Sequence, residues 1–164
     1  MTESQQQQIF EIWLNEHKGI FFKVIRSYAS VAEDQEDLFQ EIAMHVWRSV
    51  ANFRNNCAVS TWIYRIALNQ AIKWSLKAKT RQAREEDDEV HHILQPKEDK
   101  PDERLIWLYD QIQKLNEVDR SLCLLMLDGF SYKEMATISG ISESYVGVKI
   151  NRIKKYLTGK AKMM

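Results

Sequence analysis

Apolar residues recur at intervals of three and four along most of this chain, and this spacing limits its fold more than any other feature. The interval is that of an α-helix, in which such residues share one face. With only two prolines and five glycines in 164 residues, the chain is also poor in the turn formers that an all-β fold requires. The pattern contains no strand candidates. We therefore predict an all-α protein.

The N-terminal part of the chain predicts three helical segments. An apolar stripe covers residues 5–29, with a break predicted near Gly19, and a second stripe covers residues 34–53. A third helix is predicted to begin near Ser60 after a short polar break. Residues 85–103 are acidic, contain both prolines and show no sustained period, so they are predicted to form a flexible linker.

The C-terminal part predicts four helices, of which the last two frame Gly140, as in a helix-turn-helix. Ser131 and Glu134 have the spacing of a capping box, and Ser142 is a predicted N-cap of the last helix. The predicted helices are 103–115, 117–128, 131–139 and 142–158. The sequence thus predicts two small helical domains, residues 1–84 and 104–164, joined by an acidic flexible linker, with a helix-turn-helix in the second.

The formal net charge of zero conceals a sorting of charge along the chain. Residues 51–84 hold seven basic and no acidic side chains, residues 85–110 have a net charge of −7, and residues 131–164 have a net charge of +5. Basic segments that also carry aromatic side chains suit nucleic-acid binding. The aromatic residues in the two basic segments are Phe53, Trp62, Tyr64, Trp74, Tyr132, Tyr145 and Tyr156. Of these, Trp62 fits the apolar stripe and is predicted to be a core residue.

Several classes of protein are disfavoured by the sequence. No apolar run approaches the ~20 residues that span a bilayer, and the N-terminus lacks the features of a signal peptide, so we expect a cytoplasmic protein without direct membrane insertion. Cys57 and Cys123 lack the spacing of a metal site, and His91 and His92 are interpreted as exposed linker residues. We expect no metal and no cofactor. Motifs typical of enzymes are missing, so we expect no catalytic residues.

Three segments carry a resemblance to a known family. They are Phe53-Arg-Asn-Asn-Cys-Ala-Val-Ser-Thr-Trp-Ile-Tyr-Arg-Ile-Ala-Leu-Asn69, Asp37-Leu-Phe-Gln-Glu41, and Leu115-Asn-Glu-Val-Asp-Arg120 followed by the helix-turn-helix. In order and spacing these segments resemble those of extracytoplasmic-function (ECF, group 4) sigma factors, the compact two-domain members of the sigma-70 family. The resemblance covers nearly the whole chain.

For the first domain, the resemblance implies two binding surfaces. The clamp coiled coil of core RNA polymerase would contact Asp37, Gln40 and Glu41. The −10 element of promoter DNA would bind the loop that runs from Phe53 to Ser60, with one base flipped out of the stack, and the following helix. The residues implied for this second surface are Phe53, Asn55, Asn56, Ser60, Arg65, Asn69, Lys73 and Lys77, with Arg81 further along the phosphate track.

For the second domain, the resemblance implies that the helix over residues 142–156 enters the major groove of the −35 element. The residues implied to contact DNA are Ser144, Tyr145, Val148, Lys149 and Arg152. The chain departs from the family pattern at three positions. Gly147 stands where Lys or Arg is usual, Tyr145 where Thr is usual, and Asn116 where Pro is usual.

The resemblance implies a sigma factor, which binds core RNA polymerase through its clamp coiled coil and flap, recognises and melts promoter DNA, and directs transcription initiation. It also implies an anti-sigma factor, membrane-anchored or free, as a partner, and a linker within the RNA exit path of the polymerase. The alternative is a stand-alone helix-turn-helix regulator with residues 1–84 as a sensing or oligomerisation module. The basic segment 51–84 disfavours this alternative, because a sensing module has no need of a second polyanion surface.

Overall fold

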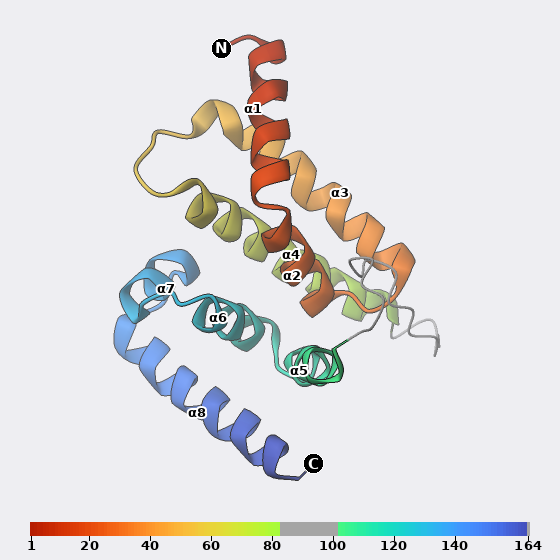
Figure 1. Cartoon of the computed structure of the whole chain (residues 1–164), viewed down its shortest axis with the longest axis vertical. Coiled ribbons are helices and arrows are strands. Elements are labelled where there is room, and N and C mark those ends of the chain that lie inside the picture. The colour runs from red at the N-terminus through yellow and green to blue at the C-terminus, as the bar shows by residue number, and fades with distance from the viewer. Residues whose placement is uncertain (83–101, 164) are drawn as a thin grey trace. The chain divides into compact units, whose positions relative to one another are not determined.

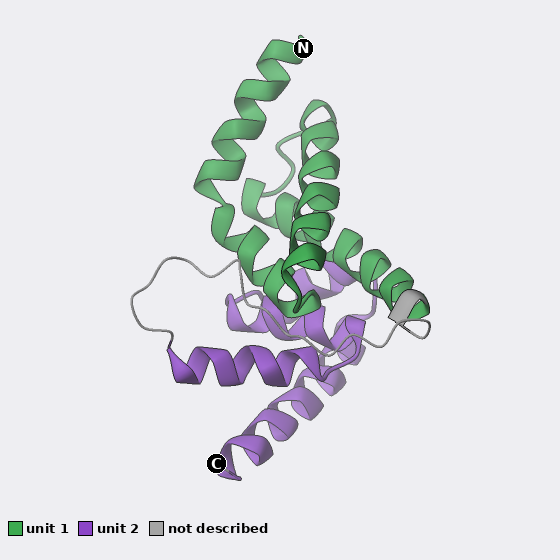
Figure 2. Ribbon diagram, turned by 90° about the vertical axis from the view of Figure 1, so that its right-hand side faces the viewer, with its two compact units in different colours: residues 1–98 green, residues 99–164 purple. Residues whose placement is uncertain are grey.

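The computed structural model describes residues 1–82 and 102–163, and every regular element in these ranges is a helix (Figure 1). The predicted all-α fold is therefore confirmed. The chain divides into two compact units, residues 1–98 and 99–164 (Figure 2). Most of the predicted linker, with its two histidines, lies outside the described residues.

The first unit contains four α-helices and one 3₁₀ helix. They are α1 (Glu3–Glu16), α2 (Lys18–Tyr28), α3 (Ala32–Ser49), η1 (Val50–Asn52) and α4 (Val59–Gln82). Helices α2, α3 and α4 pack on one another, and α1 lies against α3 and η1. The core of this unit includes Phe21, Val24, Ile25, Leu38, Ile42, Val46, Ile63, Tyr64, Ala67 and Leu68.

The break that was predicted near Gly19 in the N-terminal helical stripe occurs at His17, two residues earlier. His17 has φ −120° and ψ 21°, a conformation that does not require glycine. Its backbone N–H still donates to the Trp13 carbonyl, while its own carbonyl accepts from Ile20. The chain therefore bends between α1 and α2 while the backbone N–H and carbonyl of His17 both stay hydrogen-bonded. Gly19 lies within α2.

The buried face of α4 is wider than the stripe read from the sequence. Tyr64, one of the aromatic residues of the basic segment, is only 1% exposed and so is not open to nucleic acid. Leu68 and Ala71 are buried beside it. The reason is that α4 packs against both α2 and α3, which together cover a broader face than one neighbouring helix would.

The second unit contains α5 (Glu103–Gln113), α6 (Glu117–Leu127), α7 (Tyr132–Ser139) and α8 (Glu143–Lys162). Helix α6 packs against the other three. The predicted capping box of Ser131 and Glu134 is confirmed, as is the Ser142 cap of α8. Gly140 ends α7 with φ 72°, the left-handed conformation for which glycine is suited. Helix α8 continues beyond its predicted end at residue 158.

The core of this second unit is closed by apolar residues from all four helices. Its buried members include Ile112, Leu122, Leu124, Leu125, Met135, Ile138, Val146, Ile150 and Ile153. Ala136 and Ile141 lie at the edge of this core and are half-buried. In the described part of the chain, every helix is too short or too polar to cross a bilayer.

Candidate nucleic-acid interface

The loop between η1 and α4 is anchored at its first residue by three aromatic rings. The Phe53 ring meets the Trp13 ring edge-on at a centroid distance of 5.3 Å and the Trp62 ring at 5.4 Å. The Trp62 indole N–H donates to the Ser49 hydroxyl at 3.0 Å. Phe53 is therefore held between α1 and α4, and the position of the first loop residue is fixed.

Beyond Phe53 the loop is open to solvent. Asn55, Asn56 and Cys57 are all exposed. Asn55 has φ 59°, a left-handed conformation that asparagine tolerates better than most residues with a Cβ. Ser60 is half-buried in the first turn of α4. Two exposed amides on an anchored loop offer donors and acceptors suited to a base edge.

The exposed face of α4 carries the remaining residues predicted for the −10 surface. Arg65 and Asn69 are both exposed and lie one turn apart, and Lys73 and Lys77 continue the same row. The side chain of Arg81 lies outside the described part. This face can therefore hold phosphates along one row while the neighbouring loop reaches a base.

The two surfaces predicted for the first unit meet in one place. A hollow of about 390 Å³ between α3 and α4 is lined by Asp37 and Glu41 on one side and by Lys73 and Lys77 on the other. Helices α3 and α4 lie side by side (Figure 1). Gln40 is exposed on α3 and does not line this hollow. From the sequence, the polymerase-binding residues of α3 and the DNA-binding residues of α4 were predicted as two separate surfaces. In the structure these two surfaces are adjacent.

Asp37 is already engaged within this hollow. Its Oδ2 accepts a hydrogen bond from the Trp74 indole N–H at 2.9 Å. Glu41 approaches the His45 imidazole at 3.9 Å. The carboxylate of Asp37 thus joins α3 to α4, in addition to any contact it makes with a partner.

Sequence reasoning missed the residues that fix the loop from a distance. Trp13 is 7% exposed and lies forty residues before Phe53 in the chain, so no local spacing reveals their contact. Trp47 links α1 to α3 in the same way, because its indole N–H donates to Gln7 at 2.9 Å. Trp62 was predicted to be a core residue, and its half-buried ring on Phe53 agrees in part.

In the second unit, the exposed face of α8 carries four of the five residues predicted for the −35 surface. Tyr145 is 47% and Val148 46% exposed, values high for such large apolar side chains. Ser144 and Arg152 are also exposed. Helix α7 precedes this helix at the tight turn of Gly140, which is the arrangement of a helix-turn-helix.

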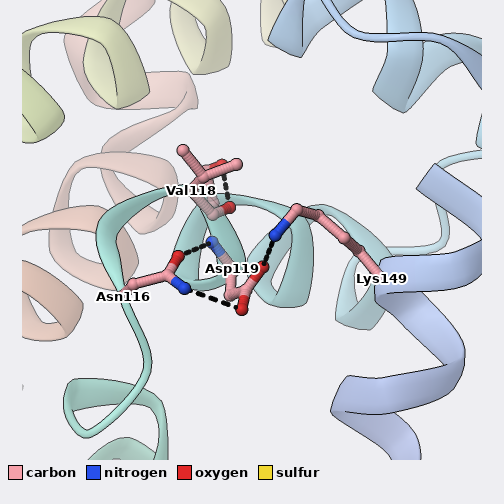
Figure 3. A network of polar contacts seen from close by, with 5 residues as sticks. Asn116, Val118, Asp119 and Lys149 are labelled. Carbon is pink, nitrogen blue, oxygen red and sulfur yellow. Dashed lines mark hydrogen bonds and ion pairs between the residues drawn. The ribbon is translucent and has the colours of Figure 1, made fainter. Parts of the chain in front are cut away.

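The fifth residue, Lys149, differs because it is tied to α6 (Figure 3). Its Nζ lies 2.8 Å from Asp119 Oδ1, and the two side chains are only 15% and 21% exposed. The pKa of Lys149 is raised, chiefly by this hydrogen bond to Asp119. Lys149 Nζ also lies 5.2 Å from the centre of the Tyr145 ring. It is therefore a cation at all ordinary pH values, with its charge directed into the protein.

The loop before α6 is also held in place by hydrogen bonds. The Asn116 carbonyl oxygen of the side chain accepts from the Asp119 backbone N–H at 2.9 Å, so Asn116 is the N-cap of α6. The Arg120 guanidinium donates to the backbone carbonyls of Leu115 and Gln113. The family pattern at this place, a leucine followed five positions later by arginine, therefore corresponds to a closed turn in front of α6.

Tyr132 and Tyr156, the other two aromatic residues of the second basic segment, differ in exposure. Tyr132 is 37% exposed and its ring lies 3.6 Å from the position of a Cβ built on Gly147. Tyr156 is half-buried and its hydroxyl lies 3.4 Å from Gln111 on α5, so it mainly joins two helices. The aromatic surface of the second unit is therefore Tyr132 and Tyr145.

The two cysteines occupy unlike environments. Burial, with a smaller contribution from Asp119, raises the pKa of Cys123 to about 11, which keeps it a neutral thiol. Cys57 is exposed in the loop before α4. In residues 1–82 and 102–163, no cluster of three histidine, cysteine or acidic side chains could hold a metal ion.

Comparison with known proteins assigns both units. The family model for sigma-70 region 2 matches residues 13–82, and the model for sigma-70 region 4 matches residues 105–157. The chain belongs to the sigma-70 family. The first match spans the anchored loop and α4, and the second spans the helix-turn-helix, so both surfaces described above lie within sigma regions.

Individual relatives narrow this assignment to the ECF sigma factors. The RNA polymerase sigma-H factor of Pseudomonas aeruginosa is 27% identical over 94% of this chain and 93% of its own. The ECF RNA polymerase sigma-E factor of Haemophilus influenzae is 26% identical over 92% and 86%. The ECF sigma-E factor of Escherichia coli K12 is 28% identical over 77% and 73%. The chain is an ECF sigma factor, a subunit that recognises promoters for RNA polymerase.

Solved structures share the fold of this sigma factor. Sigma factor RpoE in complex with the anti-sigma factor NepR from Bartonella quintana has a TM-score of 0.70 and 20% identity, covering 94% of this chain and 98% of that one. CnrH in complex with the cytosolic domain of CnrY has a TM-score of 0.66 and 20% identity, covering 98% and 95%.

Proposed function

We propose that this ECF sigma factor binds core RNA polymerase and opens promoter DNA with the residues placed on its two helical units. The observation that carries this proposal is that two basic, exposed helix faces, on α4 and α8, each lie in a sigma region matched in the expected order. The protein makes and breaks no bond itself in this proposal, because the polymerase performs the chemistry. It acts in the cytoplasm, where the polymerase and the DNA are.

The −10 element binds the loop and the adjoining face of α4. Asn55 and Asn56 contact a base that leaves the stack, Arg65 and Asn69 read the neighbouring bases, and phosphates lie along Lys73 and Lys77. All six of these side chains are exposed, which supports the proposal. Phe53 contributes by fixing the start of the loop, since its ring is packed between Trp13 and Trp62.

The −10 surface can be tested with two alanine variants. Arg65→Ala and Asn69→Ala should abolish open-complex formation while core polymerase binding stays unchanged, because both side chains are exposed and hold no described core in place. Run-off transcription and permanganate footprinting measure opening, and co-purification measures binding to core enzyme. Normal transcription by both variants would remove this surface from the proposal.

The clamp coiled coil of core polymerase binds α3 at Asp37, Gln40 and Glu41. Glu41→Lys should weaken association with core enzyme, because the change reverses a charge at the edge of the hollow. Glu16→Lys is the matched control, since Glu16 is exposed at the end of α1, away from the hollow. Equal co-purification of both variants with core polymerase would contradict the contact.

The −35 element binds α8 in its major groove, with Ser144, Tyr145 and Val148 toward the bases and Arg152 toward the backbone. This assignment is supported by an exposed tyrosine, valine and arginine that follow one another on α8 at spacings of three and four. The promoter sequence can be obtained by transcribing a genomic fragment library with core polymerase and this protein, and by reading the start sites.

A regulator that covers these surfaces completes the proposal. One solved structure named above is a complex of a sigma factor with an anti-sigma factor, and the other is a complex of CnrH with the cytosolic domain of CnrY. We propose that this protein also has an anti-sigma partner, membrane-anchored or free, which covers one or both DNA-binding faces. Co-purification of an untagged partner that blocks run-off transcription would identify it.

The family matches do not favour the stand-alone regulator, and a mobility-shift experiment tests the sigma-factor function against it. A sigma factor should bind a promoter fragment tightly only together with core polymerase. Tight and sequence-specific binding of duplex DNA by the protein alone would favour the regulator.

A further inference from the structure

The ion pair between Lys149 and Asp119 bears on how α8 reads DNA. Lys149 lies on the DNA-facing helix of the proposed function, and a lysine there would ordinarily be assigned to a phosphate. Yet its ammonium lies 2.8 Å from Asp119 Oδ1, and both side chains are mostly buried. Because the lysine side chain is bonded to this carboxylate and is only 15% exposed, little of it is left open to a phosphate.

Asp119 is itself fixed on α6, so the pair joins two rigid elements. Its Oδ2 accepts from the Asn116 side-chain amide at 3.0 Å, and its backbone N–H donates to the same side chain (Figure 3). Figure 3 shows Lys149 reaching from α8 toward this carboxylate on α6. A carboxylate that is already held in place forms a stronger ion pair than a mobile one, because less conformational entropy is lost when the pair forms.

The same lysine also contacts an exposed side chain on the DNA-facing side of α8. Its Nζ lies 5.2 Å from the Tyr145 ring centre, within the range of a cation–π contact. Tyr145 is 47% exposed and lies one turn before Lys149 on α8. One ammonium therefore touches both the anchor on α6 and the ring that faces outward.

We propose that Lys149 is a positioning residue, which fixes α8 on α6 and orients Tyr145 for base contact, and that it does not bind a DNA phosphate. Asn116 takes part because its amide holds Asp119. Proline, the usual residue at this position in the resembling family, has no side-chain amide to do so. This inference rests on the proposed function of α8 as the −35 helix.

The salt dependence of DNA binding distinguishes a positioning lysine from a phosphate-binding one. Each phosphate contact contributes about 0.9 to the slope of log K against log salt concentration. Each full-length variant is reconstituted with core polymerase into a holoenzyme. The holoenzyme is then titrated with a promoter fragment identified by the library transcription, at several salt concentrations from about 50 to 200 mM. Arg152→Ala should reduce the slope by about 0.9, whereas Lys149→Ala should leave it nearly unchanged while weakening affinity for the promoter.

A charge exchange supplies the decisive comparison. Lys149→Asp alone should weaken promoter binding, and adding Asp119→Lys should recover about tenfold, because the pair is rebuilt with reversed charges. A phosphate-binding lysine would show no such recovery, since the exchanged protein still presents an acid to DNA. Lys149→Arg should retain affinity, and circular dichroism shows whether each variant is folded.

Equal loss of slope in Lys149→Ala and Arg152→Ala, or no recovery on charge exchange, would overturn the positioning role. These outcomes leave the wild-type protein a functioning sigma factor. Failure of the wild-type holoenzyme to select any promoter would instead refute the proposed function. The variants therefore test the positioning role of Lys149, and the wild-type holoenzyme tests the proposed function.

Discussion

At the scale of single residues, Asn55 combines a backbone requirement with a chemical role. Its φ of 59° is costly for most residues with a Cβ, and its side-chain amide is exposed. Substitution by two different residues separates these properties, because glycine adopts positive φ freely and alanine does not.

We expect Asn55→Gly to fold like the wild type and yet to lose open-complex formation, because it keeps the loop conformation and removes the amide. Asn55→Ala should also lose open-complex formation and should be less stable than the glycine variant by about 1 kcal/mol. Chemical denaturation and permanganate footprinting measure the two properties. Full promoter opening by Asn55→Gly would mean that the amide reads no base.

Gly147 is the second residue at which a substitution is informative. A Cβ at this position would lie 3.6 Å from the Tyr132 ring, an ordinary van der Waals contact. We expect Gly147→Ala to raise the free energy of unfolding by up to ~1 kcal/mol, because glycine is unfavourable within a helix. Thermal unfolding checks this value, and a lower stability would mean that the Tyr132 ring has no room for a methyl group.

Gly147 also stands where the resembling family usually carries a basic residue. We expect Gly147→Lys to strengthen promoter binding by the holoenzyme and to steepen its salt dependence by about 0.9, the contribution of one added phosphate contact. Gly147→Gln is the uncharged control of similar length. Identical slopes for the two variants would show that this position does not face the DNA backbone.

At the scale of elements, the start of α7 depends on a capping box that titrates. The pKa of Glu134 lies below its ordinary value of 4.5, first because the Ser131 backbone N–H binds the carboxylate and second because the Ser131 hydroxyl does. A lowered pKa in the folded state means that the charged carboxylate stabilises the fold above the unfolded-state pKa. This contribution is lost as the pH falls through the folded-state pKa.

We therefore expect the wild type to be more stable than Glu134→Gln at neutral pH, and we expect the gap to close below the ordinary pKa of the carboxyl group. Glutamine keeps a hydrogen bond to Ser131 without the charge, so the comparison isolates the titration. Thermal midpoints of both proteins across the acidic range test this. A gap that does not change with pH would contradict the role of ionisation.

The Ser131 side of the same capping box can be removed directly. Ser131→Ala should lower the free energy of unfolding by about 1 kcal/mol, because the Glu134 backbone N–H loses the hydroxyl that accepts its hydrogen bond. Ser131→Asp is the control, since aspartate is also a good N-cap. Urea denaturation measures both variants, and equal losses in the two would argue against capping as the cause.

At the scale of the whole molecule, each compact unit has a core built from its own helices. The contacts that close the first core join α2, α3 and α4, and those that close the second join α6, α7 and α8. We expect residues 1–98 and residues 99–164, expressed separately, each to unfold cooperatively. Circular dichroism melts of both pieces test this, and a piece without a cooperative transition would show that its core needs the rest of the chain.

The sequence by itself determined the class of the fold and the order of its parts. Spacings of three and four specify helices wherever they occur, and Ser131, Glu134, Gly140 and Ser142 act within one or two turns of their own position, so local chemistry sufficed to predict the helix-turn-helix and its caps. The two predicted domains were divided in the same way, because the charge and the prolines of the acidic segment are read directly from its own residues.

Only the tertiary structure decided which predicted contacts are free to meet DNA. Tyr64 is buried because α2 and α3 together cover α4, and Phe53 is held by Trp13, forty residues earlier in the chain. Lys149 is paired with Asp119, thirty positions away. Contacts between residues so distant in sequence arise from the packing of helices, and the spacing along any one helix carries no record of them.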